Sequence, residues 1–362
     1  PSLGDAELLR RHGWTTSTLF EHWSSLLKSR RITRVAEVVI DDGVFDLQFV
    51  HPSWPVDQQH KRYVAQIGGL NFNLNCIDFY LRTTTRGAIV QYRIDPATAY
   101  AQITNTCAFG DRNSVWLSRE LGSNRIVLKG QAQASSSEPI SVTVHDPGMF
   151  FAFTLSEALR ASGVEVINPP VRDLQAHARQ NLILLAQHET PLELVLRRAN
   201  KDSINLYAEC LLKRLGAAST GGRGGSWQNG ATAIGAFTGE RGVPPTEITI
   251  DDGSGLSRKN RLSANALTQI LAADFFGPHR QTFISSLAVG GIDGTLDARF
   301  RDDLKGRVFA KTGYVANARC LSGFLRTRKD QWYAFAILVN GPVGIEGRRI
   351  QEQIVAAIDR ND

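Results

Sequence analysis

The stretch that most constrains the fold lies near the end of the printed sequence, where two apolar runs flank a Lys-Thr-Gly triplet. The first run, 308–314, contains the triplet, and the second run, 321–324, follows after a short gap. Two apolar segments this close together are typical of a β-hairpin. We therefore predict that Lys311, Thr312 and Gly313 lie on a strand. A cation and a hydroxyl group side by side on a strand can hold a carboxylate, and glycine lets the backbone of a ligand approach closely.

A second polar cluster lies at the junction between two predicted helices. Thr190 and Pro191 resemble an N-cap followed by proline at the first helical position, and this helix runs to about Arg198. The next helix is indicated by apolar residues at helical spacing: Ile204, Tyr207, Ala208, Leu211 and Leu215. Ser203 and Asn205 fall near the junction, where short polar side chains can turn into a cleft. By themselves they favour ordinary helix capping, but together with the downstream triplet they favour a functional site.

Two glycine-rich stretches lie between these motifs. Residues 247–258 are typical of a strand that runs into a glycine-rich turn, and Ser263 then caps a helix that ends at about Phe276. The other stretch, 288–296, ends in Asp-Gly-Thr-Leu. Four motifs therefore follow one another along the chain: Ser-x-Asn, Asp-Gly-Ser-Gly-Leu-Ser-Arg, Asp-Gly-Thr-Leu and Lys-Thr-Gly.

This order of motifs closely resembles the penicillin-binding protein 4 type of D-Ala-D-Ala carboxypeptidases and endopeptidases, peptidase family S13. The resemblance runs from Pro1 to about Asn340. Short strings of this kind match by chance when taken singly, but chance does not produce them in this order with these gaps. The sequence is therefore identified as a member of that family.

The resemblance implies an α/β (α+β) multidomain fold. Residues 172–362 are expected to form a transpeptidase or β-lactamase-like domain, with a central antiparallel sheet flanked by helices. Residues 1–171 are expected to form β-rich accessory domains, with about 73–138 as a nested inner one. Residues 332–339 are apolar at every position, and this pattern predicts a central strand covered by helices on both faces.

The chemistry implied by the resemblance is serine acyl transfer on the stem peptides of peptidoglycan, with inhibition by β-lactam antibiotics. Ser203 and Asn205 would relay protons and hold the amide of the acyl side chain. Lys311 and Thr312 would bind the terminal carboxylate, and the strand backbone around Tyr314 would supply one oxyanion donor. Ser203, Asn205 and Lys311 are thus the candidate catalytic residues.

Two further substrate contacts are implied at positions that have simpler explanations. Arg258, in the Gly-Leu-Ser-Arg string, matches a substrate-contacting arginine of the family, although a solvated surface arginine is the simpler interpretation. Asp41 matches an accessory-domain aspartate that meets the amino group of the stem peptide, although Asp42 is adjacent and a β-turn role is equally natural. Ala316 stands where a common family member has a polar side chain, so that one substrate contact is not expected here.

The nucleophile motif of the family, Ser-x-x-Lys, is not found where the family requires it. In that motif the lysine lies one helical turn beyond the serine, so that its amine reaches the hydroxyl group. The literal match, Ser25 to Lys28, comes after the segment that the motif should precede. We interpret this match as part of an amphipathic helix that leads into a strand over 35–40. We therefore expect the printed sequence to begin downstream of its nucleophile.

Three functions remain open at this point. The first is a D-Ala-D-Ala carboxypeptidase or endopeptidase whose nucleophile lies outside the printed sequence. The second is a non-catalytic family member that binds peptidoglycan or a partner. The third is a serine β-lactamase, a class that shares the three motifs Ser-x-x-Lys, Ser-x-Asn and Lys-Thr-Gly. The large segment before Ser-x-Asn argues against this third function.

Composition narrows the expected partners and location. The formal net charge of +6 is modest for 362 residues, and the basic residues are not interleaved with aromatic ones, so nucleic acid is not an expected partner. No apolar stretch approaches the ~18 residues of a membrane span, and no signal segment is present. A periplasmic or other extracytoplasmic location is implied by the family resemblance alone.

Metal and cofactor chemistry are not indicated. The eight histidines show no metal-ligand pattern, so neither a metal nor another cofactor is expected. The glycine-rich run 221–226 lacks the ending of a phosphate loop, and we predict a flexible connection before a helix that starts at Ser226. A bridge between Cys76 and Cys107 stays open for an exported protein, while the remaining cysteines are expected to be buried thiols: Cys210 and Cys320.

Overall fold

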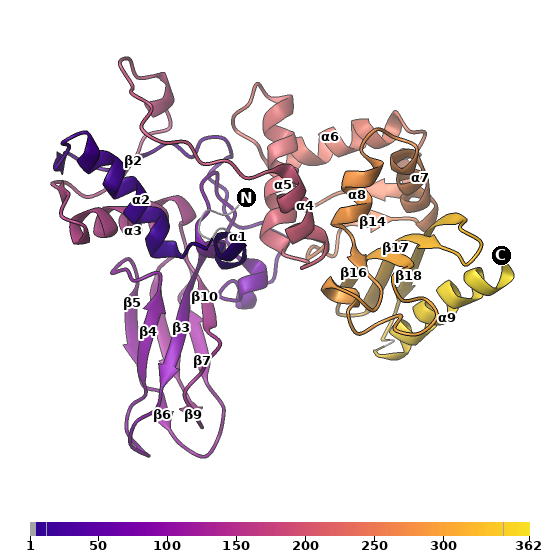
Figure 1. Ribbon diagram of the computed structural model, residues 1–362, viewed down its shortest axis with the longest axis horizontal. Helices are drawn as coiled ribbons and strands as arrows, with labels where there is room; N and C mark the ends of the chain where they lie inside the picture. Colours follow the sequence, from indigo (N-terminus) through magenta and orange to yellow (C-terminus); the bar gives the residue numbers. More distant parts are fainter. Residues whose placement is uncertain (1–4, 12, 343) are drawn as a thin grey trace. The chain divides into compact units, whose positions relative to one another are not determined.

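The computed structural model describes residues 5–11, 13–342 and 344–362 (Figure 1). Helices and short strands alternate along most of this length, with long strands confined to a few sheets. The predicted mixed α/β class is therefore confirmed.

The described residues form two compact units. The first consists of Pro1–Glu189 together with Gly222–Gly224, and the second consists of Thr190–Gly221 and Gly225–Asp362. The domain boundary that we predicted after residue 171 lies within the first unit. There, strand β12 (Val171–Arg172) pairs in parallel with β2 (Val39–Ile40), which belongs to the same unit.

The helices of the first unit start at well-formed caps. They are α1 (Ala6–Arg11), α2 (Thr16–Ser29) and α3 (Pro147–Ala161). The Thr15 side chain accepts a hydrogen bond from the Thr18 N–H at the start of α2, and the Asp146 side chain does the same for the Met149 N–H at the start of α3. Aromatic rings fill the core that α2 and α3 share: Phe20, Trp23, Phe72, Phe150 and Phe151.

The strand that we predicted over 35–40 is not continuous. It is divided into β1 (Arg34–Val35) and β2, and each half pairs with a different partner. Strand β1 pairs in parallel with β11 (Glu165–Val166), whereas β2 pairs with β12. The chain changes partner between the two halves, so one apolar run in the sequence becomes two short strands.

An ion-pair network centred on Arg172 ties β12 to the start of α3. Both prongs of the Arg172 guanidinium bind the buried Asp42 carboxylate, with Nε–Oδ1 at 2.9 Å and Nη2–Oδ2 at 3.0 Å. The same guanidinium binds Asp146, the N-cap of α3, at 2.8 and 2.6 Å. Two-pronged arginine–carboxylate pairs are the strongest geometry for such contacts, so this network fixes the helical part of the unit.

The rest of the first unit is rich in strands, drawn in magenta shades in Figure 1. A three-stranded antiparallel sheet has the order β10-β3-β4: β10 (Ile140–Thr143), β3 (Cys76–Arg82) and β4 (Gln91–Asp95). A second sheet has the order β5-β8-β7: β5 (Gln102–Asn105), β8 (Arg125–Lys129) and β7 (Trp116–Arg119). A parallel pair completes this part: β6 (Ala108–Phe109) and β9 (Gln131–Ala132).

The second unit contains the predicted hairpin within a four-stranded antiparallel sheet. The strands in spatial order are β15 (Ala288–Val289), β16 (Val308–Val315), β17 (Ala318–Arg326) and β18 (Trp332–Asn340). Lys311 on β16 lies opposite Ser322 on β17. The hairpin prediction is confirmed, including the position of Lys-Thr-Gly on its first strand.

Helices cover both faces of this sheet. On one face, Val308, Leu321 and Phe335 pack with Val355 of α9 (Glu346–Asn361). On the other face, Phe324 and Trp332 pack with α7 (Ala264–Phe275) and α8 (Arg280–Ser286). Removal of such side chains from water stabilises the fold by roughly 1.5–3 kcal/mol each.

The central position predicted for 332–339 is wrong for the described strands, because β18 lies at an edge of the sheet. The covering of both its faces was predicted correctly. An apolar run reports only what lies above and below a strand. It does not report whether another strand lies beside it.

The remaining elements of the second unit connect the sheet to the Ser-x-Asn region. The helices are α4 (Leu192–Asn200), α5 (Asn205–Ser219) and α6 (Trp227–Gly239). The short strands β13 (Ile248–Thr249) and β14 (Arg261–Leu262) pair on either side of the Asp-Gly-Ser-Gly loop. Ser226 caps α6 as predicted, since its side chain accepts a hydrogen bond from the Asn229 N–H at 3.1 Å.

The cysteines are free thiols: Cys76, Cys107, Cys210 and Cys320. Cys76 and Cys107 are both free, so the bridge that the sequence left open does not form in this structure. Cys210 is buried as predicted, whereas Cys320 is only half-buried. Of the helices described, none has both the length and the apolar character needed to cross a membrane.

Candidate active site

The junction of α4 and α5 places Ser203 in a constrained backbone conformation. Its φ of 55° lies in the left-handed region, which side chains other than glycine seldom adopt. The Ile204 N–H bonds back to the Arg198 carbonyl at 3.1 Å, and Asn205 is the first residue of α5. Backbone in sparsely populated regions persists only where the surroundings hold it, and such positions cluster at functional sites.

Lys311 brings β16 and this junction together. Its Nζ donates a hydrogen bond to the Ser203 Oγ at 2.7 Å and another to the Thr312 carbonyl oxygen at 2.6 Å. Burial lowers the pKa of Lys311 to about 8. Burial disfavours the charged form of an amine, so this ammonium group loses its proton more readily than a surface lysine does.

Thr312 contacts a third segment of the chain. Its Oγ1 lies 3.0 Å from the Oγ1 of Thr295, in the short helix η6 (Gly294–Leu296) that follows β15. The Thr295 N–H in turn donates to the Lys201 carbonyl at 3.1 Å. Gly294 has a φ of 59°, and a side chain there would meet the Lys201 carbonyl oxygen at 2.7 Å. The Asp-Gly-Thr-Leu motif therefore needs its glycine in order to pack against the α4–α5 junction.

An ion pair also holds the Asp-Gly-Thr-Leu motif against the α4–α5 junction. The Lys201 Nζ lies 2.5 Å from the Asp293 Oδ2, and the Asp293 Oδ1 accepts the Val289 N–H at 2.8 Å. Neither Lys201 nor Asp293 was predicted as a site residue. Asp293 lies in the Asp-Gly-Thr-Leu motif and Lys201 lies two residues before Ser203, but their mutual contact requires the packing of segments that are distant in sequence.

The Asp-Gly-Ser-Gly loop is anchored by a buried carboxylate on α5. Glu209 accepts the N–H groups of Gly253 and Ser254 at 2.9 and 2.8 Å, and its Oε2 also accepts the Trp227 indole N–H at 2.7 Å. The Glu209 side chain is buried. Burial, reinforced by the nearby charge of Asp252, raises the pKa of Glu209. The sequence analysis missed this residue, which shows there only as a polar position in an apolar helix.

The second half of the loop closes around Asp252. Its carboxylate accepts the N–H groups of Gly255 and Ser257 at 2.9 and 2.6 Å, and the Asn260 amide at 2.6 Å. The loop is thus held from within, and Arg258 is exposed between these anchors. The structure places Arg258 in the same unit as Ser203 and Lys311, and its contact with a substrate stays a prediction.

The remaining predicted residues of β16 lie at the exposed end of the strand. Gly313 and Tyr314 follow Thr312 directly, and Tyr314 is 68% exposed. The Arg319 guanidinium lies 4.2 Å from the centre of the Tyr314 ring. The structure therefore brings Ser203, Lys311 and Thr312 into contact and leaves the backbone after them open to solvent.

Asp41 belongs to the first unit, where its carboxylate already has partners. Arg223 Nη2 lies 2.5 Å from Oδ1, and the ring and backbone nitrogens of His177 lie 2.6 and 3.1 Å from Oδ2. Burial would raise the pKa of Asp41, but hydrogen bonds from Arg223, His177 and the Gly43 N–H outweigh it and lower the pKa to about 2. The bond from Gly43 at 3.2 Å also fits the turn role that we considered. Contact with a stem peptide stays a prediction.

The glycine-rich run was predicted to be a flexible connection, but part of it is held in the first unit. The Gly224 N–H donates to the Gly43 carbonyl at 3.0 Å, and Arg223 also binds the Leu174 carbonyl at 2.8 Å. The sequence analysis missed these contacts of Arg223 and Gly224, because nothing in the spacing of the glycines indicates a partner near Asp41.

The literal Ser-x-x-Lys match lies on α2 in the first unit. Ser25 and Lys28 are exposed, and the Ser25 hydroxyl donates to the His22 carbonyl within the helix at 2.7 Å.

The described residues hold no group of three or more histidine, cysteine, aspartate or glutamate side chains that could bind a metal ion.

Comparison with known proteins shows one family over nearly the whole chain. The family model described as "D-Ala-D-Ala carboxypeptidase 3 (S13) family" matches residues 3–361. The D-alanyl-D-alanine carboxypeptidase of Actinomadura sp. (strain R39) is 28% identical over 340 residues, which are 89% of this chain and 62% of the relative. The carboxypeptidase DacB of Haemophilus influenzae is 26% identical over 352 residues, or 93% of this chain and 70% of the relative.

The fold matches a solved structure over most of its length. Penicillin-binding protein 4 from Haemophilus influenzae superposes with a TM-score of 0.75 at 22% identity, covering 93% of this chain and 79% of that protein. The same protein has been solved in complex with a β-lactam. The chain spans less than two thirds of the length of the Actinomadura relative.

Proposed function

The chain belongs to the D-Ala-D-Ala carboxypeptidase 3 (S13) family, and on that premise we propose that it is part of a serine-type carboxypeptidase or endopeptidase. The proposed substrates are the stem peptides of peptidoglycan, and β-lactams are the proposed inhibitors. The observation that carries the proposal is the 2.7 Å hydrogen bond between the Lys311 Nζ and the Ser203 Oγ, next to the Thr312 hydroxyl. Such a substrate requires a location outside the cytoplasm, in the periplasm or at the cell surface.

Lys311 and Thr312 are proposed to bind the terminal carboxylate of the substrate. An ammonium group and a hydroxyl group can both donate to one carboxylate, and charge-assisted hydrogen bonds are about twice as strong as neutral ones. A pKa of about 8 keeps most of the Lys311 population charged at neutral pH. The described hydrogen bonds of this ammonium go to uncharged oxygens, so a carboxylate would be its strongest partner.

Ser203 is proposed to pass protons between Lys311 and the reacting serine. Its hydroxyl accepts from the Lys311 Nζ and can therefore donate its own proton onward. Asn205 is proposed to hold the amide of the acyl group, and the backbone around Tyr314 to stabilise the oxyanion. The nucleophile itself is left unassigned, because the literal Ser-x-x-Lys of this sequence lies on α2 in the first unit.

Labelling of the natural protein with a fluorescent penicillin tests the proposal. We expect Lys311→Ala to slow acylation roughly 100-fold or more, because it removes the proposed partner of the carboxylate and of Ser203. Lys305→Ala is the matched control, since Lys305 is an exposed lysine of the same unit, and it should label at the normal rate. Release of D-alanine from a peptide ending in D-Ala-D-Ala should fall in parallel.

Other outcomes select the alternatives. Normal labelling of Lys311→Ala would remove this site from the mechanism. Reversible binding of peptidoglycan fragments without any covalent label would favour the non-catalytic function. Rapid hydrolysis of the labelled penicillin, without turnover of the peptide, would favour a β-lactamase.

A further inference from the structure

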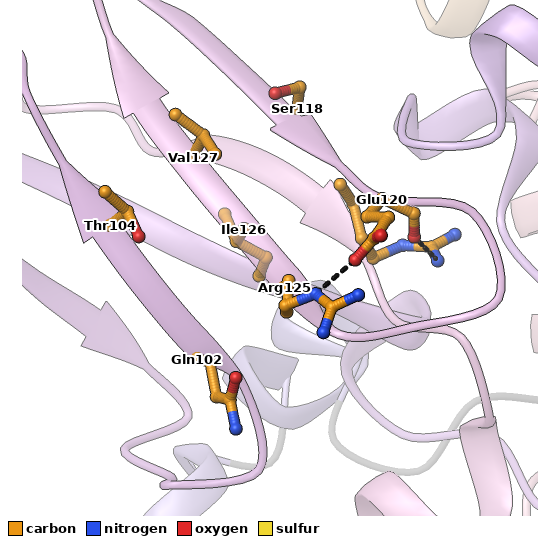
Figure 2. A pocket seen from close by; sticks show the side chains of 8 residues that line it. Gln102, Thr104, Ser118, Glu120, Arg125, Ile126 and Val127 are labelled. Atoms are coloured by element: carbon orange, nitrogen blue, oxygen red, sulfur yellow. Dashed lines mark hydrogen bonds and ion pairs between the residues drawn. The ribbon is translucent and has the colours of Figure 1, made fainter.

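The outward face of the β5-β8-β7 sheet in the first unit is hollowed. In the sheet register, Thr104 on β5 and Ser118 on β7 both lie beside Val127 on the central strand β8. Gln102 lies beside Arg125 one step along the same face. These side chains line a cavity of about 400 Å³, which Figure 2 shows from close by. Sites for small molecules are typically 300–1,000 Å³, so the cavity can hold about one sugar ring with its substituents.

The lining offers hydrogen-bonding groups that the protein does not use. Within the part of the chain that the structure describes, no hydrogen bond involves the side chains of Gln102, Thr104 or Ser118. Together they supply an amide and two hydroxyl groups around the apolar Val127. Such a lining suits a ligand that presents many hydroxyl and amide groups over an apolar ring face.

The charged side chains that line the cavity already have partners within the protein. Arg125 and Glu120 form an ion pair across one end, marked by a dashed line in Figure 2. Arg119 turns its guanidinium toward backbone carbonyls, at 2.9 Å from Ser123 and 3.2 Å from Gln59. Among the described lining residues, the Arg125 charge is balanced by Glu120 and the Arg119 guanidinium binds backbone carbonyls, so the lining favours an uncharged ligand over an anionic one.

An exposed tryptophan extends the same face. Trp116 lies two residues before Ser118 on β7, and side chains two apart on a strand point to the same side of the sheet. It is 45% exposed, and the Lys61 ammonium lies 4.2 Å from the centre of its ring. The His60 ring, 5.6 Å away between ring centres, and the Lys61 ammonium cover part of this ring. The part that stays exposed offers a flat apolar surface beside the polar cavity, against which the C–H face of a sugar can pack.

We propose that the cavity and Trp116 form a binding site for a glycan, a run of uncharged pyranose units carrying hydroxyl and acetamido groups. The sugar strand of peptidoglycan has this chemistry, and that assignment of the natural ligand rests on the proposed function. The site would hold the strand by its sugars, independently of the residues proposed to act on the stem peptide.

The test is a calorimetric titration of the protein with the tetramer of N-acetylglucosamine. The unaltered protein should bind it, and Thr104→Arg, which fills the cavity, should weaken binding roughly tenfold or more. Trp116→Ala should weaken binding to a similar extent. Thr84→Arg is the matched control, because Thr84 is an exposed threonine in a loop of the same unit, and it should bind normally. Both threonines are exposed, so neither change should prevent folding.

Further measurements distinguish the glycan site from the proposed peptidase activity. The proposal is overturned if the tetramer does not bind, if Thr104→Arg binds it as well as the unaltered protein, or if a glycan-free stem peptide competes for the cavity. Release of D-alanine from that glycan-free peptide reports on the proposed function alone, and Thr104→Arg should leave it unchanged. If the unaltered protein releases D-alanine but does not bind the tetramer, the glycan site alone is contradicted. If it binds the tetramer but releases no D-alanine, the proposed function alone is contradicted.

Discussion

Lys311 in the second unit and Asp41 in the first are both charged side chains that the fold shields from water, but their surroundings are opposite. The Asp41 carboxylate receives the Arg223 guanidinium, the His177 ring and two backbone N–H groups. The described contacts of the Lys311 ammonium are a hydroxyl group and a carbonyl oxygen. The first unit therefore balances the charge of Asp41 with its own residues. The second unit holds a cation, Lys311, that a bound carboxylate would balance. This difference separates charges that maintain the fold from charges available to a ligand.

The largest expected effect on stability comes from removal of Arg172, whose charge is balanced by two carboxylates of the first unit. Arg172→Met leaves Asp42 and Asp146 without their cation, and Asp42 is buried. Loss of one partner of a buried pair typically costs about 3–5 kcal/mol, so we expect the free energy of unfolding of the first unit to fall by that order. Denaturation with urea measures it.

Arg179→Met is the control for this variant, because the Arg179–Asp173 pair is largely exposed. Exposed pairs contribute about 0–1 kcal/mol, so this change should be small. If both variants lose the same stability, the Arg172 network does not hold the unit in the way described.

The second prediction concerns Lys311, the charged residue of the second unit in this comparison. Lys311→Met removes a cation that burial already disfavours, so we expect the free energy of unfolding at pH 7 to change by less than about 1 kcal/mol. The same variant should lose acylation. A large loss of stability in the urea titration would make Lys311 a structural residue and would remove the contrast with Arg172.

The third effect is a dependence on pH set by Lys311. Its folded pKa of about 8 lies below the ordinary value of 10.5, so the ammonium loses its proton as the pH rises through about 8. Carboxylate binding and acylation should therefore fall above pH 8. The unfolded chain holds this proton up to about 10.5, so the contribution of Lys311 to stability rises between these two pH values. A penicillin acylation rate that stays constant from pH 7 to pH 10 would contradict this assignment.

The smallest effect is expected at Asp41. Asp41→Asn should lower stability by about 1 kcal/mol or less, since its partners Arg223 and His177 are both more than a third exposed. The folded pKa of about 2 lies below the ordinary 3.8, so the stabilisation is present above pH 3.8 and is lost as the pH falls toward 2. Thermal unfolding at pH 7 and pH 2 should show a difference between the two proteins only at pH 7.

Local sequence patterns predicted the parts of the site that depend on neighbours in the chain. The hairpin with Lys311 follows from two adjacent apolar runs, and the position of Ser203 follows from the helix limits on either side. The bond between them joins residues that are 108 positions apart. The family resemblance placed both residues in one site, but it did not predict this bond.

The anchors of the loops could not be predicted in this way. Glu209 reaches Gly253 and Ser254 from 44 and 45 positions away, and Arg223 reaches Asp41 from 182 positions away. Each is a single polar residue, and no local pattern indicates its partner. Only packing decides which backbone groups a buried carboxylate will meet. For the same reason, the apolar run of β18 predicted its covered faces but not its place at the sheet edge.

The Glu209 anchor has a consequence for the motion of the loop that carries Arg258. Amide protons in surface loops usually exchange with solvent quickly, because their hydrogen bonds open without disturbing the core. The N–H groups of Gly253 and Ser254 instead end on a buried carboxylate that also binds Trp227, the first residue of α6. Their release requires the parting of α5, α6 and the loop together. In hydrogen-exchange experiments these two amides should therefore be protected like the helices around them, and Arg258 would be displayed from a rigid support.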